Sequence, residues 1–68
     1  MNKLELEIAM KKKGVTTKQL CKAIGMSRSA FYRKCNGISE FTIGDINKIV
    51  AYLELKTPMG IFFDEEVS

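Results

Sequence analysis

The sequence contains no histidine and only two cysteines, Cys21 and Cys35. A structural zinc site generally needs four Cys or His ligands, so these thiols could complete one only with carboxylates or a partner chain. The missing imidazole also removes the usual activator of a nucleophilic thiol, and no glycine-rich phosphate loop follows a strand. We therefore expect no metal site, no cofactor and no enzymatic activity.

Long hydrophobic runs are also missing, although 46% of the residues are hydrophobic. The apolar runs are only a few residues long, which is too short to cross a bilayer. A signal peptide would keep its central region apolar, but Glu5 and Glu7 interrupt the N-terminal stretch. A chain of 68 residues has room for one small domain. We expect a cytoplasmic protein with free thiols, no membrane contact and no evident small-molecule ligand.

Acidic residues are absent from one half of the chain. Between Ile8 and Ser39 there are eight basic residues and no acidic one, whereas the other residues include three basic and eight acidic ones. Positive charge concentrated in this way is typical of a surface that binds a polyanion. A lysine-rich surface that only keeps a small protein soluble would explain the charge equally well.

Helix start signals recur along the sequence. A capping residue is followed three positions later by Glu, Gln or Asp at Asn2, Thr16 and Thr42. Further starts lie at Ser27 and at Thr57 before Pro58, and glycine stop signals lie at Gly14, Gly25 and Gly37. No strand pattern competes with them. The sequence therefore predicts an all-α domain with five helices near residues 3–13, 17–24, 28–35, 43–54 and 58–63.

Apolar residues at helical spacing indicate the buried faces of these helices. The clearest stripe lies in the fourth predicted helix and comprises Ile43, Ile46, Ile49, Val50 and Leu53. The other core candidates are Leu6, Ala9, Met10, Leu20, Cys21, Ile24, Phe31, Leu55, Ile61 and Phe62.

The second and third predicted helices are joined by only Gly25, Met26 and Ser27. A connection this short forces a sharp crossing, as in a helix-turn-helix. The motif needs small residues where the helices touch, which Cys21 and Ala30 provide, and a residue that accepts positive φ, which Gly25 provides. Apolar anchors flank the turn at Leu20, Ile24, Met26 and Phe31.

The segment TKQLCKAIGMSRSAFYRKCNG, residues 17–37, resembles the helix-turn-helix of the phage repressor and Cro family, the XRE type. Val15 and Thr16, the amphipathic fourth helix and residues 57–63 match as well, so the resemblance covers nearly the whole chain. It implies that residues 1–68 form one compact, lambda-repressor-like DNA-binding domain in the bacterial cytosol or nucleoid.

Three positions depart from the family pattern. Cys21 stands where alanine is usual, and Phe31 replaces a more usual β-branched residue. Lys34 occupies a position that is usually apolar, which thins the inner face of its helix. We expect its stem to pack on this face while its ammonium group reaches water.

The third predicted helix carries the candidate reading face. A step of 100° per residue places Arg28, Ser29, Tyr32 and Arg33 on one arc, facing away from Ala30, Phe31 and Lys34. In a helix-turn-helix the beginning of this helix enters the major groove, where arginine pairs with guanine. The alternative is that these residues only form a solvated helix face.

Contacts to the DNA backbone are expected from the elements beside the reading face. Backbone N–H groups and short polar side chains suit phosphate at the start of the second helix, at the turn and in the loop of residues 36–39. Lys18, Lys22 and Lys34 add long-range attraction, and Lys11, Lys12 and Lys13 fit a solvated helix end. The candidate backbone contacts are Thr16, Thr17, Lys18, Ser27, Asn36, Gly37 and Ser39.

The resemblance implies a homodimer on a pseudo-palindromic operator in double-stranded DNA. The candidate dimer contacts are Leu55, Met59, Phe62 and Phe63, although Ile61 and Phe62 could equally close the core of the monomer. The predicted function is that of a sequence-specific transcriptional regulator, a small phage or prophage-type repressor or a Cro-like protein. The alternative is a protein-interaction module on the same fold, such as an antitoxin-like or antirepressor-like partner.

Overall fold

The computed structural model describes residues 2–56 and 59–62. In these residues the chain forms helices and no strand, which confirms the all-α prediction. Four helices of at least eight residues are α1 (Lys3–Lys13), α2 (Thr17–Ile24), α3 (Arg28–Cys35) and α4 (Ile43–Leu53). A single helical turn, α5 (Met59–Phe62), follows, and the outer parts of the fifth predicted helix, at Pro58 and Phe63, lie outside the described residues.

The helix boundaries follow from local capping chemistry. Thr16 and Thr42 each form a complete capping box with the residue three positions later. Asn2 and Ser27 cap their helices with one bond each, from the backbone N–H of Glu5 and of Ala30. Left-handed residues then end α1, α2 and α4, at Gly14, Gly25 and Glu54.

A small core holds the helices together. Its largest fully buried side chains are Leu6 from α1, Leu20 from α2, and Ile49 and Leu53 from α4. The other buried residues are Met10, Cys21, Ile24, Phe31, Cys35, Ile46, Ile61 and Phe62. Most of the predicted core is therefore confirmed.

Two positions correct the predicted core. Ile43 is 64% exposed, because it is the first residue of α4 and the inward stripe of that helix begins only at Ile46. Phe41 lies before α4 and belongs to no helical stripe, yet it packs on the core. Its ring makes edge contacts with the rings of Phe31 and Phe62, at centroid distances of 5.9 and 5.5 Å.

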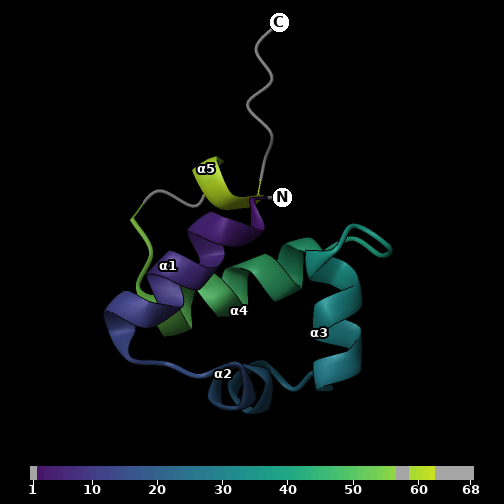
Figure 1. Ribbon diagram of the computed structural model, residues 1–68, viewed down its shortest axis with the longest axis horizontal. Coiled ribbons are helices and arrows are strands. Elements are labelled where there is room, and N and C mark those ends of the chain that lie inside the picture. The colour runs from purple at the N-terminus through teal and green to yellow at the C-terminus, as the bar shows by residue number, and fades with distance from the viewer. Residues whose placement is uncertain (1, 57–58, 63–68) are drawn as a thin grey trace, which may run out of the picture.

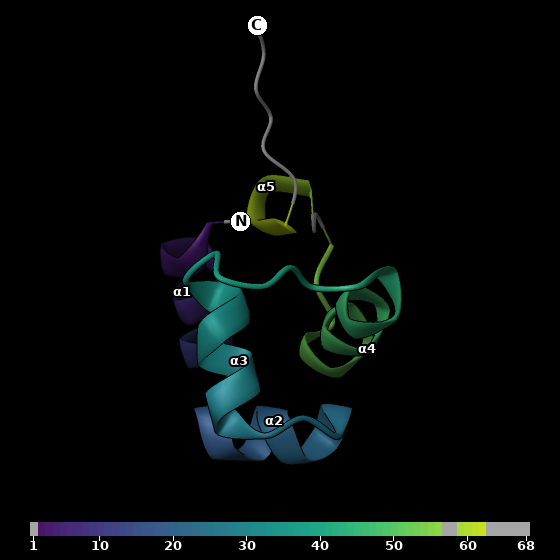
Figure 2. The same cartoon turned by 90° about the vertical axis from the view of Figure 1, so that its right-hand side faces the viewer.

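The arrangement leaves α3 at one side of the molecule. In Figure 1, α4 runs through the middle, α2 lies below it and α3 stands at the right. Figure 2 turns this side toward the viewer, and α3 then lies in front with α2 crossing beneath it. The backbone N–H of Asn2 donates to the carbonyl of Ile61 at 2.6 Å, which ties the start of α1 to α5.

The turn at Gly25 yields a stability prediction. Gly25 has φ +71°, and a Cβ atom there would meet nothing within 4 Å, so Gly25→Ala introduces backbone strain and no clash. We expect it to lower the free energy of unfolding by about 1 kcal/mol. The matched control is Gly44→Ala in α4, which we expect to be neutral or slightly stabilising because alanine favours helix. Urea denaturation measures both variants, and an equal loss in both would contradict this explanation.

Candidate nucleic-acid interface

The turn between α2 and α3 has the predicted length and capping. The backbone N–H of Met26 donates to the carbonyl of Cys21 at 3.0 Å, so the chain turns directly after Gly25. Ser27 Oγ then accepts the backbone N–H of Ala30 at 3.1 Å and starts the next helix. As a result, α3 begins at Arg28, as predicted.

The outer face of α3 is open to solvent. Phe31 and Cys35 are buried, whereas Arg28, Ser29, Tyr32 and Arg33 are all exposed. The ring of Tyr32 rests edge-on against the ring of Phe31 at a centroid distance of 6.0 Å, which supports it from the core side. The structure therefore brings the four predicted reading residues onto one accessible face of α3, the helix at the front of the molecule in Figure 2.

The starts of α2 and α3 provide backbone donors next to this face. Thr16 already uses its backbone N–H, which donates to Gln19 Oε1 at 2.9 Å in the capping box. The first three residues of a helix have backbone N–H groups without an acceptor carbonyl in that helix. The third is capped here by Thr16 Oγ1 or by Ser27 Oγ, so two remain in each helix. In α2 these belong to Thr17 and Lys18, and in α3 to Arg28 and Ser29. Together with the positive ends of the helix dipoles, they favour an anion such as phosphate.

The loop after α3 differs from the prediction. The backbone N–H groups of Asn36, Gly37, Ile38 and Ser39 all donate to carbonyls of α3, at 2.9 to 3.3 Å. The expectation that these amides approach phosphate is therefore not supported, because they already close the helix. The side chains of Asn36 and Ser39 remain exposed.

Sequence analysis missed Lys3, which reaches this loop from the start of α1. Its Nζ donates to Asn36 Oδ1 at 3.2 Å. The two residues are 33 positions apart, so no local pattern in the sequence could have paired them. Because Asn36 Oδ1 accepts this bond, the side-chain NH2 group of Asn36 points away from Lys3 and can donate to another group. The contact also places the positive charge of Lys3 beside the loop.

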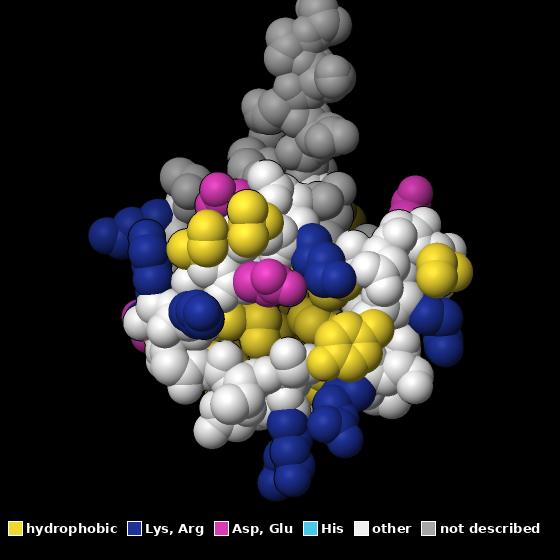
Figure 3. Space-filling model, in the orientation of Figure 1, with side chains coloured by type: hydrophobic (Ala, Val, Ile, Leu, Met, Phe, Trp, Pro, Cys, Tyr) yellow, Lys and Arg dark blue, Asp and Glu magenta, His cyan; other side chains and the backbone are white. Residues whose placement is uncertain are grey.

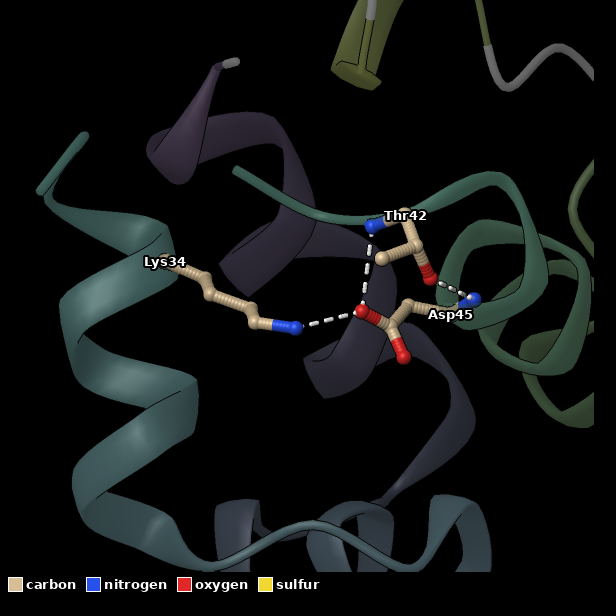
Figure 4. A network of polar contacts seen from close by, with 3 residues as sticks. All are labelled: Lys34, Thr42 and Asp45. Atoms are coloured by element: carbon tan, nitrogen blue, oxygen red, sulfur yellow. Dashed lines mark hydrogen bonds and ion pairs between the residues drawn. The ribbon is translucent and has the colours of Figure 1, made fainter. Parts of the chain in front are cut away.

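Lys34 also departs from its predicted role. Its Nζ lies 2.6 Å from Asp45 Oδ2, and the two side chains are only 19% and 17% exposed. The ammonium group thus ends on a carboxylate of α4 (Figure 4), although the Lys34 side chain keeps 19% of its surface exposed. Because Asp45 offsets its charge at short range, Lys34 contributes less net positive charge to long-range attraction than its sequence position alone predicts.

The remaining basic residues of α2 and α3 are exposed. Lys18, Lys22, Arg28 and Arg33 lie in two helices that contain no acidic residue. In Figure 3, the lower edge of the molecule, over α2 and the start of α3, shows basic side chains and no acidic ones. Lys13 is different, since it pairs with Glu54 at 2.6 Å.

Comparison with protein-family models matches residues 5–58 to the Cro/C1-type HTH DNA-binding domain. The chain belongs to this family. The matched range contains α2, the turn and α3 in full, so the predicted resemblance is confirmed. Searches of curated proteins and of solved structures found no match.

Membership in the Cro/C1-type family identifies DNA as the partner and regulation as the role. Enzymatic activity is not typical of such domains. None of the helices in the described residues is long and apolar enough to cross a membrane.

The two thiols of this Cro/C1-type domain lie in its core. Cys21 is 4% exposed and Cys35 is 8% exposed. Burial raises the pKa of Cys21 above its usual value and raises the pKa of Cys35 to about 11. Both thiols are therefore neutral near pH 7 and act as small packing residues of the helix-turn-helix.

The candidate dimer contacts of the Cro/C1-type domain are in different environments. Leu55 is half-buried and lines a surface groove between α1 and the segment after α4, together with Ile8 and Ala9. Phe62 is only 9% exposed and packs on Phe41, so it closes the core of the monomer. Met59 is the first residue of α5, and Phe63 lies outside the described residues.

The Lys34 contact predicts a dependence of stability on acidic pH. The hydrogen bond from Lys34 is the main reason that the pKa of Asp45 falls below its usual value of 3.8. A lowered pKa means that the ionised form stabilises the fold above pH 3.8 and that this contribution is lost as the pH falls further. At pH 6 we expect Asp45→Asn to reduce the free energy of unfolding by about 2 kcal/mol.

Denaturation between pH 6 and pH 2 measures this effect. The gap between the wild type and Asp45→Asn should close as the pH falls. Glu54→Gln is the control, because the ion pair between Glu54 and Lys13 is exposed and solvent screens its attraction. A gap for Asp45→Asn that stays constant over the whole range would contradict the interpretation.

Proposed function

We propose that this protein is a sequence-specific transcriptional regulator that binds a pseudo-palindromic operator in double-stranded DNA as a homodimer. Within this class, we propose a small phage or prophage-type repressor or a Cro-like protein of the bacterial cytosol or nucleoid. The single observation that carries the proposal is the outer face of α3, on which Arg28, Ser29, Tyr32 and Arg33 are all exposed. An exposed recognition helix with two arginines suits readout in the major groove.

Each residue of this face has a separate proposed role. Arg28 and Ser29 start α3, the end of a recognition helix that enters the groove, so they meet base edges. The guanidinium fork of Arg28 matches the two major-groove acceptors of guanine. Tyr32 contacts a thymine methyl group or a phosphate, and Arg33 contacts a base or a phosphate.

Phosphate contacts flank the reading face. We assign them to the free N–H groups of Thr17 and Lys18, the hydroxyl groups of Thr16 and Ser27, and the side chains of Asn36 and Ser39. Gly37 allows the DNA backbone to approach closely because it has no side chain. These contacts position the protein but carry no sequence information.

A dimer is proposed because one small domain contacts too few base pairs to be specific. Two copies on one face of the duplex would read half-sites about 34 Å apart. The proposed contacts between the two copies are Leu55, Met59 and Phe63, which lie in or near α5 in the sequence. We propose that α5 is the fifth helix of a lambda-repressor-like domain. Phe62 is left out because it belongs to the core of the monomer.

Selection from a randomised duplex library tests the proposal. The purified protein is incubated with the library at near-physiological salt, and the bound DNA is sequenced. An enriched inverted repeat with half-sites one helical turn apart is the expected result. Binding that is only salt-sensitive, without enrichment, would overturn the proposal and favour an antitoxin-like or antirepressor-like protein-interaction module.

Two substitutions separate base readout from phosphate attraction. Arg28→Ala should relax specificity at one base position, at a cost of about 1 to 3 kcal/mol on the cognate site. Lys18→Ala should weaken cognate and scrambled duplexes about equally and reduce the dependence of binding on salt. Fluorescence anisotropy on both duplexes at several salt concentrations measures these effects. Equal losses on both duplexes for Arg28→Ala would rule out its role in base readout.

A further inference from the structure

The contact between α3 and α4 depends on a few side chains. In Figure 2 the backbone of α3 stands apart from that of α4. Two of the contacts between these regions are the edge contact of Phe31 with Phe41, two residues before α4, and the ion pair between Lys34 and Asp45. Figure 4 shows Lys34 extended from α3 toward the start of α4. The ammonium group also lies 6.0 Å from the centroid of the Phe41 ring.

The carboxylate that receives Lys34 is itself fixed. Asp45 Oδ2 accepts the backbone N–H of Thr42 at 3.0 Å, and Thr42 Oγ1 accepts the backbone N–H of Asp45 at 3.0 Å. The same oxygen accepts Lys34 Nζ at 2.6 Å. Further along, α4 is anchored in the core by Ile49, which is 0% exposed. Lys34 therefore binds to a rigid cap and not to a freely rotating side chain.

The ion pair is also sheltered from solvent. Both side chains are less than one-fifth exposed, so water and salt screen their attraction less than at an open surface. Removing one partner would leave the other as a partly buried, unpaired charge. The pair thus resists opening and constrains the distance between α3 and the start of α4.

This constraint acts on the helix that carries the reading face. Lys34 directly follows Arg33 and lies six residues after Arg28, about 9 Å along the helix axis. A tilt or rotation of α3 would move both arginines relative to the base pairs. Lys34 itself sits on the inner side of α3 and is engaged by Asp45.

We propose that Lys34 is a positioning residue for DNA recognition. Through Asp45 it sets the orientation of α3 on α4, and thereby the place where Arg28 and Arg33 meet the bases. Lys34 does not bind DNA. The proposal rests on the proposed function, since it assumes that α3 reads an operator.

The chain contains a matched control pair. Lys13 and Glu54 are also 2.6 Å apart, but they are 41% and 73% exposed and join α1 to the residue after α4. Lys13→Met removes the same positive charge as Lys34→Met without touching α3. A comparison of the two variants therefore separates the orientation of α3 from overall electrostatic attraction.

The experiment uses four variants of the full chain, Lys34→Met, Lys34→Arg, Asp45→Asn and Lys13→Met, and the double variant of Lys34→Met with Asp45→Asn. Asparagine keeps an oxygen that can accept the N–H of Thr42, so the cap of α4 is preserved. Arginine can restore the ion pair. Affinity is measured on the selected operator and on a scrambled duplex, at several salt concentrations and at a temperature where circular dichroism shows each variant folded.

We expect Lys34→Met and Asp45→Asn to lower the ratio of operator to scrambled affinity by about tenfold, the loss from misaligning one arginine–guanine contact. The double variant should lose no more than either single variant, because both break one interaction. Lys34→Arg and Lys13→Met should keep the wild-type ratio. An unchanged ratio in Lys34→Met would overturn the proposal. So would equal losses on both duplexes together with a lower salt dependence, since these indicate a phosphate contact.

A second measurement on the free protein keeps this test independent of the proposed function. Amide chemical shifts and hydrogen exchange of residues 28–35 are compared between the variants by NMR. Lys34→Met and Asp45→Asn should shift these amides and speed their exchange, whereas Lys13→Met should not. If library selection finds no operator, the proposed function fails, and this measurement still decides whether Lys34 orients α3. Unchanged amides in α3 would refute the orientation.

Discussion

The small core in which α1, α2 and α4 meet is the constraint on which the rest of the structure depends. Leu6, Leu20 and Ile49 come from different helices and are 0 to 1% exposed. A domain of this size has room for one hydrophobic core, so each helix must bury its apolar face in the same cluster. The position of α2 is fixed in this way, and the turn at Gly25 then determines where α3 begins.

The proposed recognition helix, α3, packs on the core through few buried side chains. Its main buried side chain is Phe31, which packs through Phe41 on Phe62 in a chain of edge contacts. Lys34 adds a polar tie to the cap of α4, at a place where the resemblance leads one to expect an apolar side chain. The outer face of α3 can carry polar residues, because the contacts with the core are made by its inner face.

Much of the fold and of the reading face could be predicted from sequence because the signals are local. A capping residue acts three positions away and a glycine acts on its own backbone, so the ends of α2 and α3 follow directly. The outward arc of Arg28 and Arg33 follows from helical periodicity. The features that escaped prediction are tertiary. Phe41 belongs to no helical stripe, Lys3 meets Asn36 in the loop after α3, and Asp45 meets Lys34 on α3.

The two buried thiols can report local unfolding of the helix-turn-helix. Cys21 lies in α2 and Cys35 in α3, and both are closed off in the folded domain. A thiol reagent attacks only a deprotonated, accessible sulfur. Modification therefore requires α2 or α3 to separate transiently from the rest of the domain. The rate of alkylation at each cysteine therefore measures how often each half of the motif opens, without any label added to the proposed DNA-facing surface.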